Sequence, residues 1–462
     1  MLGYAFFYRR AQLRGRWQGV AISVATALIV AMPLLIHFVR FPGDFSGRTN
    51  QVSIVSNGGI PALLDNLRIV MEMAFVRGDL NDRLNYPGRP VLDMFLLVPF
   101  LAGMAHTLRR FSRPGSVFLL AGLGCMLLPT LLTDEAPNFG RATGALPFFA
   151  LLIALGLDRL LAWVSRWRPA LRVPGSVVGW GLLLLSTALT ARIYFVKYAE
   201  LPNLYDSWET GYTQVAYDIA NISRADVGTP ELAYVEEEIA RHPTLAYLLS
   251  DQSGAKLPRT VSSLNTCLRI APDMPARYYF NATTESPAPD LLMSYLPDSR
   301  QCATISTPAG TPRFKIIEQP AGGRVQFPEL QPLPRSLQDG IELMGYWLSQ
   351  PTVRAGDRLY VRLFWRVTAQ PTQSYTVFAH LNQAGQVAAG SDDLPGRGSC
   401  STSDWRPGEV VMHELQLAVP ADLPAGPYDV TVGLYRLDTM QRLDVADSVD
   451  DQISLGTIEV GR

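Results

Sequence analysis

The residues best suited to chemistry in this sequence are arginines in two segments between apolar stretches. Arg83 and Arg89 lie in the segment 77–90, and Arg141 lies in the segment 133–147. A guanidinium group binds phosphate through two parallel hydrogen bonds, and Arg141 precedes an apolar helical pattern whose free N–H groups favour an anion. We predict that these arginines bind an anionic phosphate. The alternative is ordinary local ion pairs, with Arg141 reaching toward water.

Two adjacent carboxylates, Asp134 and Glu135, precede Arg141 in the same segment. Carboxylates bind divalent metal ions or accept a proton from a reacting hydroxyl. The alternative is that both residues only cap a turn. The sequence identifies no metal site with certainty and leaves a metal requirement open.

The composition separates the chain into two halves. Hydrophobic residues make up 48% of the 462 residues and charged residues 18%, below the roughly 25% charged residues of soluble proteins. Residues 1–196 contain 19 arginines, no lysine and nine acids, a net charge of +10, whereas residues 197–462 have a net charge of −11. This pattern excludes a single soluble domain and a disordered chain. Nucleic acid is not an expected partner, because the basic clusters flank apolar runs.

Five apolar segments have about the 20 residues that are needed to cross ~30 Å of hydrocarbon. Arginine clusters before the first, after the second and after the fourth segment lie in alternate loops, which the positive-inside rule places in the cytoplasm. We therefore predict a multi-pass protein of the cell membrane, with everything after residue 197 extracytoplasmic. A transmembrane domain over 1–196 would contain spans near 20–39, 91–108, 115–133, 143–164 and 175–196.

The chain begins with an apolar stretch, residues 2–8, that runs directly into an arginine-rich segment. It looks like the end of an earlier span, so we expect further spans upstream. The alternative is a short interfacial segment. Between the first two spans, apolar residues over 60–75 recur at helical spacing, which predicts an amphipathic helix on the membrane surface or against the bundle.

The second half predicts a small α/β domain over 197–320, a Pro/Gly-rich linker over 321–335 and an antiparallel, immunoglobulin-like β-sandwich over 336–462. Trp347 and Trp405 are candidates for stacking on sugar rings, while Trp365 belongs to an alternating strand and is expected in the core. Cys267 and Cys302 are the preferred disulfide pair, which leaves Cys400 unexplained. The predicted fold class is a multidomain membrane protein: a helical bundle, an α/β domain and a β-sandwich.

This order of parts resembles the C-terminal part of bacterial C-type membrane glycosyltransferases, which are related to protein O-mannosyltransferases and to the aminoarabinose transferases of lipid A. Three regions carry the resemblance. They are Asp79–Asp93 entering the second span, Pro137-Asn-Phe-Gly-Arg141 leading to Leu146-Pro147, and the sandwich motifs Leu343-Met-Gly-Tyr, Tyr375-Thr-Val-Phe-Ala-His380-Leu and Trp405-Arg-Pro-Gly-Glu409.

The resemblance implies transfer of a sugar from a polyprenyl-phosphate carrier to a glycan or protein acceptor outside the cytoplasm. Arg141, with Arg83 and Arg89, would then bind the carrier phosphate. The family's catalytic acidic pair lies in an early outer loop that this chain does not match, and we do not equate Asp134 and Glu135 with it. The isolated chain is therefore expected to be inactive. The lipid-linked sugar would be the donor substrate, and no cofactor is certain.

A second hypothesis belongs to a different class of protein. The apolar segments could anchor a non-catalytic protein that binds carbohydrate or assembles the cell envelope through its outer domains. Paired acidic residues in an upstream outer loop would favour the enzyme, whereas polysaccharide binding by the outer domains would favour the anchor. The sequence does not identify the sugar, the acceptor or the oligomeric state.

Overall fold

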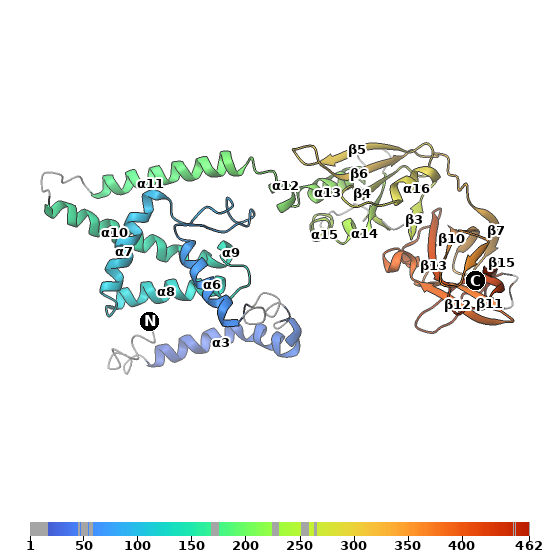
Figure 1. Ribbon diagram of the computed structural model, residues 1–462, viewed down its shortest axis with the longest axis horizontal. Helices are drawn as coiled ribbons and strands as arrows, with labels where there is room; N and C mark the ends of the chain where they lie inside the picture. Colours follow the sequence, from blue (N-terminus) through green and yellow to red (C-terminus); the bar gives the residue numbers. More distant parts are fainter. Residues whose placement is uncertain are drawn as a thin grey trace. The chain divides into compact units, whose positions relative to one another are not determined.

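The computed structural model describes residues 17–44, 47, 54, 59–167, 175–223, 231–250, 258–262, 266–446, 448 and 450–461. The chain forms two compact units, Met1–Ser207 and Trp208–Arg462, which we call the helical unit and the β-rich unit (Figure 1). The apolar stretch 2–8 and the arginines that precede the first span lie outside the described residues.

The described residues of the helical unit form helices and the segments between them. Its elements are α3 (Trp17–Arg40), α6 (Gly59–Glu72), α7 (Met94–Arg109), α8 (Pro114–Leu131), α9 (Phe139–Ala142), the 3-10 helix η1 (Thr143–Ala145), α10 (Leu146–Trp167), α11 (Gly175–Arg192), the π-helix η3 (Ile193–Tyr198) and α12 (Leu204–Ser207).

Four described helical segments are long and apolar enough to cross a membrane: Ala21–Arg40, Pro114–Leu131, Phe139–Arg166 and Val177–Tyr198. The sequence predicted five spans, and the second of them differs. The helix α7 has only 16 residues, because the Asp93 carboxylate accepts hydrogen bonds from Phe95 N (2.9 Å) and Leu96 N (3.1 Å) and so begins the helix there.

Helices α7 and α10 cross at two glycines, which lets their backbones approach closely. A Cβ atom on Gly156 would lie 1.7 Å from the carbonyl oxygen of Pro99, and one on Gly103 would lie 1.9 Å from that of Leu152. Close crossings through small residues are typical of helices in membranes, where packing supplies much of the association energy.

We expect Gly156→Ala to destabilise the helical unit by about 1–3 kcal/mol, because the added methyl group overlaps a backbone oxygen that cannot move aside. Thermal unfolding of the full chain in detergent micelles should show a lower midpoint. Gly124→Ala is the matched control, since a Cβ atom there meets nothing within 4 Å. Equal midpoints for the two variants would contradict the packing argument.

The first part of the β-rich unit is a mixed sheet with helices. Its sheet has the strand order β2-β1-β4-β6-β5, in which β1 is parallel to both β2 and β4. The elements are α13 (Thr210–Ile222), β1 (Leu232–Glu236), α14 (Glu237–Ala240), α15 (Pro243–Ser250), β2 (Arg259–Val261), β3 (Cys267–Ile270), β4 (Ala276–Asn281), α16 (Ala288–Tyr295), β5 (Arg300–Ser306) and β6 (Pro312–Gln319).

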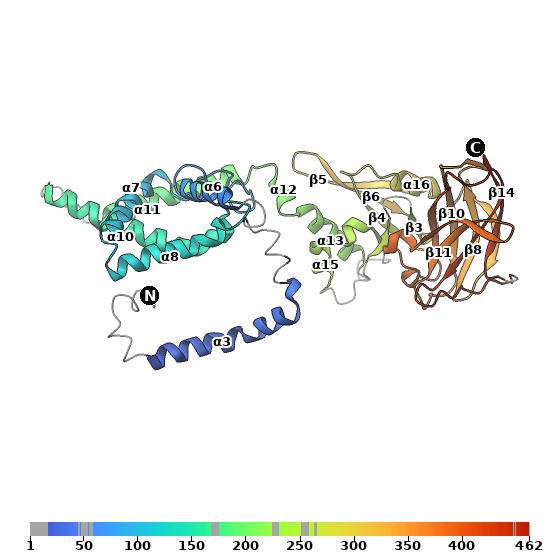
Figure 2. The ribbon, with the colours of Figure 1, turned by 60° about the horizontal axis from the view of Figure 1, so that its bottom comes forward.

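The second part is a sandwich of two sheets, with strand orders β3-β13-β10-β8-β7 and β12-β11-β14-β15-β9 (Figure 2). The elements are β7 (Gln331–Ser336), β8 (Ile341–Leu348), β9 (Thr352–Arg354), β10 (Arg358–Val367), β11 (Thr376–Gln383), β12 (Gln386–Asp393), the 3-10 turns η5 (Pro395–Gly398) and η6 (Thr402–Asp404), β13 (Val410–Ala418), β14 (Gly426–Tyr435) and β15 (Ile453–Gly461).

Alternation along the strands builds the sandwich core as the sequence predicts. Leu359, Val361, Leu363 and Trp365 of β10 are all fully buried, which confirms the core position of Trp365. Most neighbouring strands pair antiparallel, but β9 pairs parallel with β15 at the edge of the second sheet.

The α/β part and the sandwich are joined more closely than the sequence predicted. Strand β3 leaves the α/β part and pairs antiparallel with β13, so the first sandwich sheet takes its edge strand from it. The segment 321–335, predicted as a linker, contains most of β7. Its residues Phe327 and Leu330 pack against the hydrophobic cluster that contains Phe364 and Tyr295. Residues 208–462 therefore form one body.

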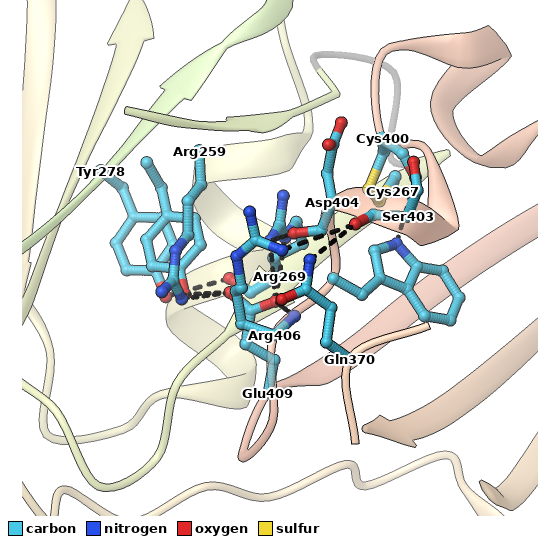
Figure 3. Close-up of polar contacts among 12 residues, drawn as sticks. Arg259, Cys267, Arg269, Tyr278, Gln370, Cys400, Ser403, Asp404, Arg406 and Glu409 are labelled. Atoms are coloured by element: carbon cyan, nitrogen blue, oxygen red, sulfur yellow. Dashed lines mark hydrogen bonds and ion pairs between the residues drawn. A yellow bond between two sulfur atoms is a disulfide. The ribbon is translucent and has the colours of Figure 1, made fainter. Parts of the chain in front are cut away.

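We call the place where β3 meets β13 and the turn before it the joint between the α/β part and the sandwich. A buried cluster of charges lies at this joint (Figure 3). The carboxylate of Glu409, 1% exposed, accepts a hydrogen bond of 2.8 Å from Arg269 Nη2 and pairs with Arg259. Tyr234 Oη donates to the same carboxylate at 2.8 Å. Burial, and then the negative charge of Glu409, raise the pKa of the Tyr234 phenol well above its usual value, so the phenol remains a donor.

The disulfide also lies at this joint, and the predicted pair is wrong. Cys267 of β3 is bonded to Cys400, whereas Cys302 of β5 carries a free thiol (Figure 3). The reason is topological: Cys267 and Cys302 belong to strands of different sheets, while the pairing of β3 with β13 brings Cys267 into the sandwich core beside Cys400.

Candidate functional site

The helical unit contains a cavity of about 380 Å³ where the segment 84–91 meets α9, η1 and the end of α11. Most of its wall is apolar. Arg89 is the one charged side chain among the described residues that line it, so we call it the Arg89 cavity. The apolar side chains include Met73, Leu84, Val91, Phe139, Leu146 and Phe149, and the polar ones are Asn85, Thr143, Thr190 and Tyr194.

The Arg89 guanidinium is held by α11. Its Nη2 donates a hydrogen bond of 2.7 Å to Thr190 Oγ1, which is its one side-chain partner among the described residues. A guanidinium has five N–H donors, so most of them are left for a ligand. Tyr194 lies one turn beyond Thr190 on the same helix face and lines the same cavity.

The loop that carries Arg89 is fixed by two buried polar residues. The Asp79 carboxylate accepts from Asn81 N (2.8 Å) and from Phe139 N (2.7 Å), which ties the loop to the start of α9. The Asn85 amide donates to the carbonyl oxygens of Asp79 (3.0 Å) and Arg89 (2.7 Å). The Asp79 carboxylate is therefore engaged in backbone hydrogen bonds, and Asn85 fixes the backbone at Arg89 through its carbonyl oxygen.

Arg141 lies beside the cavity rather than on its wall. Asn138 Oδ1 accepts from Arg141 N at 3.0 Å and begins the short helix α9. The neighbours Gly140 and Ala142 line the cavity, but the Arg141 side chain does not. Its Nη1 is buried without a hydrogen-bond partner among the described residues. A buried guanidinium nitrogen without a partner favours an anion nearby.

The structure does not bring Arg83 to this cavity. Its exposed side chain donates through Nε to the carbonyl oxygen of Ser207, the last residue of α12. The preceding Asp82 accepts from Ser207 Oγ at 2.7 Å, and Tyr198 Oη donates to the Asp82 carbonyl at 2.5 Å. Asp82 and Arg83 thus hold the segment that leaves the helical bundle.

Asp134 and Glu135 are both exposed and lie in a turn. Thr133 Oγ1 donates to Asp134 Oδ1 at 3.2 Å, and neither carboxylate lines the Arg89 cavity. Within the described ranges, no group of three His, Cys, Asp or Glu side chains is arranged to hold a metal ion. The structure does not bring these two carboxylates to the Arg89 cavity.

The tryptophans predicted to stack on sugars are engaged inside the β-rich unit. Trp405 is fully buried, and its Nε1 donates to the Cys400 carbonyl at 3.1 Å. The stacking prediction for Trp405 is therefore wrong, because its side chain packs in the sandwich core. Trp347 is half-buried, and the Arg362 guanidinium carbon lies 4.6 Å from its ring centroid, so one ring face is covered.

Sequence reasoning missed Asn85, Thr190 and Tyr194 as cavity residues. The spacing of Thr190 and Tyr194, four residues apart in an apolar segment, places both on one helix face. That face could have been recognised as a polar stripe, but its meeting with Arg89, about 100 residues earlier in the chain, is a long-range contact that no local pattern contains.

No protein-family model and no curated protein matches this chain. Solved structures that share some likeness include the C-terminal domain of wzt, with 16% identity over 29% of this chain and 83% of that chain and a TM-score of 0.21. A Niemann-Pick type C2 protein from Japanese carpenter ant has 8% identity over 28% of this chain and 96% of that chain, with a TM-score of 0.19. The CARDB domain of a Pyrococcus furiosus protein has 11% identity over 30% of this chain and 100% of that chain, with a TM-score of 0.17. These scores carry no argument about fold or function.

Proposed function

We propose that this chain is the carrier-binding C-terminal part of a membrane glycosyltransferase, which transfers a sugar from a polyprenyl-phosphate carrier to an extracytoplasmic glycan or protein. The Arg89 cavity is the observation that supports this proposal most directly. It combines one cationic side chain with an apolar wall, at the end of helices long and apolar enough for a membrane. That combination suits an isoprenoid chain that ends in a phosphate.

The chemistry assigns separate tasks to the arginines and to a base. The bond between the anomeric carbon of the sugar and the phosphate oxygen breaks, and a bond to the acceptor oxygen forms. The phosphate keeps the electron pair, so Arg89 and the neighbouring Arg141 would stabilise the charge that develops on it. A carboxylate takes the proton of the acceptor hydroxyl. By resemblance, that carboxylate belongs to an early outer loop rather than to Asp134 or Glu135.

The disulfide supports an extracytoplasmic β-rich unit. Cys267 and Cys400 are bonded across the joint, and disulfides persist in oxidising compartments. The alternating arginine clusters of the helical unit favour the same orientation. The β-rich unit would then lie on the side where the acceptor is modified.

We expect Arg89→Ala and Arg141→Ala each to weaken the binding of farnesyl phosphate at least tenfold. The loss corresponds to a charge-assisted hydrogen bond worth about 1.5–3 kcal/mol. Tryptophan fluorescence of the full chain in lipid nanodiscs measures the affinity, with farnesol as the ligand that lacks the phosphate. Arg77→Ala is the matched control. Arg77 is an exposed arginine of the loop that carries Arg89, and neither it nor its neighbours in sequence line the cavity, whereas Arg141 stands between two lining residues and has a buried guanidinium nitrogen.

Wild-type protein that binds farnesyl phosphate no better than farnesol would contradict the carrier site. The non-catalytic alternative would then gain support if the full chain bound a polysaccharide and kept that binding in Arg89→Ala and Arg141→Ala.

A further inference from the structure

Helix α7 is shorter than the thickness of hydrocarbon that its neighbouring helices can span. At 1.5 Å per residue its 16 residues extend about 24 Å, against ~30 Å of hydrocarbon. It contacts α10 through Phe100 and Phe149, whose rings stack at 5.1 Å, and α11 through Asp93 and Ser186. Both neighbours belong to helical segments of full spanning length. A short helix fixed between two long ones creates a local mismatch with the bilayer.

The mismatch falls at the N-terminal end of α7, next to the loop that lines the Arg89 cavity. The other end of the helix is followed by Arg109, Arg110 and Arg113, which cannot enter hydrocarbon without a large cost. These arginines keep the C-terminal end of α7 at the membrane surface on that side. The start of α7 at Met94, together with the loop before it, is therefore the part that falls short of the opposite surface.

The continuation of α11 forms a wall beside this recess. Ser186 donates to the Asp93 carboxylate at the start of α7, and the helical segment goes on to Tyr198. At the rise of an α-helix, those further residues extend at most about 18 Å past Asp93. This exceeds the shortfall of about 6 Å in α7, so the end of the extension, which carries basic residues, lies beyond the hydrocarbon. Thr190 and Tyr194 lie on this extension and line the cavity. The cavity thus lies on the loop side of the start of α7, next to the part of α11 and η3 that extends past it.

The loop before α7 has the backbone pairing that such a depth requires. Irregular backbone at membrane depth is tolerated only where its polar groups are satisfied by protein or by a water-filled cavity. Val91 N donates to the Met73 carbonyl at 3.0 Å, and Leu92 N donates to the Ala74 carbonyl at 2.9 Å. The buried Asn85 amide satisfies two more carbonyls of the loop.

We propose that α7 is a fifth, short membrane crossing, that the bilayer thins around it, and that the Arg89 cavity opens at the bottom of this depression. Bilayer thickness then regulates the site, because a thicker bilayer must deform more to reach Arg89. The inference rests on the proposed function for the ligand that fills the cavity, but the mismatch itself follows from the helix lengths.

Two readouts on the full chain in phosphatidylcholine nanodiscs test this proposal. The acyl chains are varied from 14 to 18 to 22 carbons, with the head group unchanged. We expect the thermal midpoint to fall with increasing chain length, and the affinity for farnesyl phosphate, expressed per mole of lipid, to fall at least fivefold from the thinnest to the thickest bilayer. A mismatch cost that accumulates per ångström produces this trend.

The outcomes separate this inference from the proposed function. A midpoint and an affinity that are both unchanged between 14 and 22 carbons, or highest at 22, would overturn the thinned bilayer while leaving the carrier site intact. Absence of farnesyl phosphate binding in every bilayer would contradict the proposed function, and the thermal midpoint would still decide whether α7 sits in a thinned patch.

Discussion

Replacing Cys400 with serine is expected to lower the free energy of unfolding of the β-rich unit by about 2–5 kcal/mol. The disulfide to Cys267 closes a loop with a sequence separation of 133 residues. In the chain-entropy description, closing a loop of that length lowers the conformational entropy of the unfolded chain, which raises its free energy by about 5 kcal/mol. Both cysteines are fully buried, so the serine hydroxyl would also lack a solvent partner.

Urea unfolding of the full chain in detergent, followed by tryptophan fluorescence, measures this loss. Cys267→Ser should lose as much as Cys400→Ser, and the double variant little more, because both changes remove the same bond. Cys302→Ser is the matched control, since its thiol is free and exposed. If Cys302→Ser were the damaging change and Cys400→Ser were silent, the pairing described here would be incorrect.

Glu409→Gln is expected to destabilise the β-rich unit by about 3–5 kcal/mol, because it removes the charge that compensates buried arginine. The shape of the side chain is kept, so the loss reports the charge. Arg269 is 2% exposed and donates to Glu409 through Nε and Nη2. Without the carboxylate it would remain buried with the Asp404 carbonyl as its other acceptor.

The same unfolding experiment compares Glu409→Gln with Glu342→Gln. Glu342 pairs with the half-exposed Arg366 at 3.5 Å, and such surface pairs contribute about 0–1 kcal/mol. Arg269→Met added to Glu409→Gln should recover part of the loss, since an apolar side chain replaces the stranded charge. Equal losses for the two glutamine variants would show that the buried cluster does not stabilise the joint.

Local patterns in the sequence were sufficient for most of the secondary structure. Apolar segments of spanning length predicted the long helices, and the β-sandwich predicted over 336–462 forms, with its strands β8 to β15 inside that range. The alternation from Leu359 to Trp365 also identified the side chains in the sandwich core, but it missed Phe364, which is fully buried on the opposite face of the strand beside Tyr295. These features depend on residues within a few positions of each other, so their periodicity is visible in the sequence.

The length of α7 shows where such patterns fail. The apolar segment near 91–108 reads as a span, but the helix starts only after Asp93, whose carboxylate caps it and contacts Ser186 of α11. The cap could be suspected from the residue type, but the contact that fixes its depth joins residues far apart in the chain.

The candidate site divides in the same way. Residue types and positions were enough to identify Arg89 and Arg141 as cations beside apolar segments. The separation of Arg83 from the cavity, the partnership of Arg89 with Thr190, the burial of Trp405 and the bond between Cys267 and Cys400 were decided by the tertiary structure. Each is a contact between distant segments, and its free energy exists only after the helices and sheets that carry the two partners have packed together.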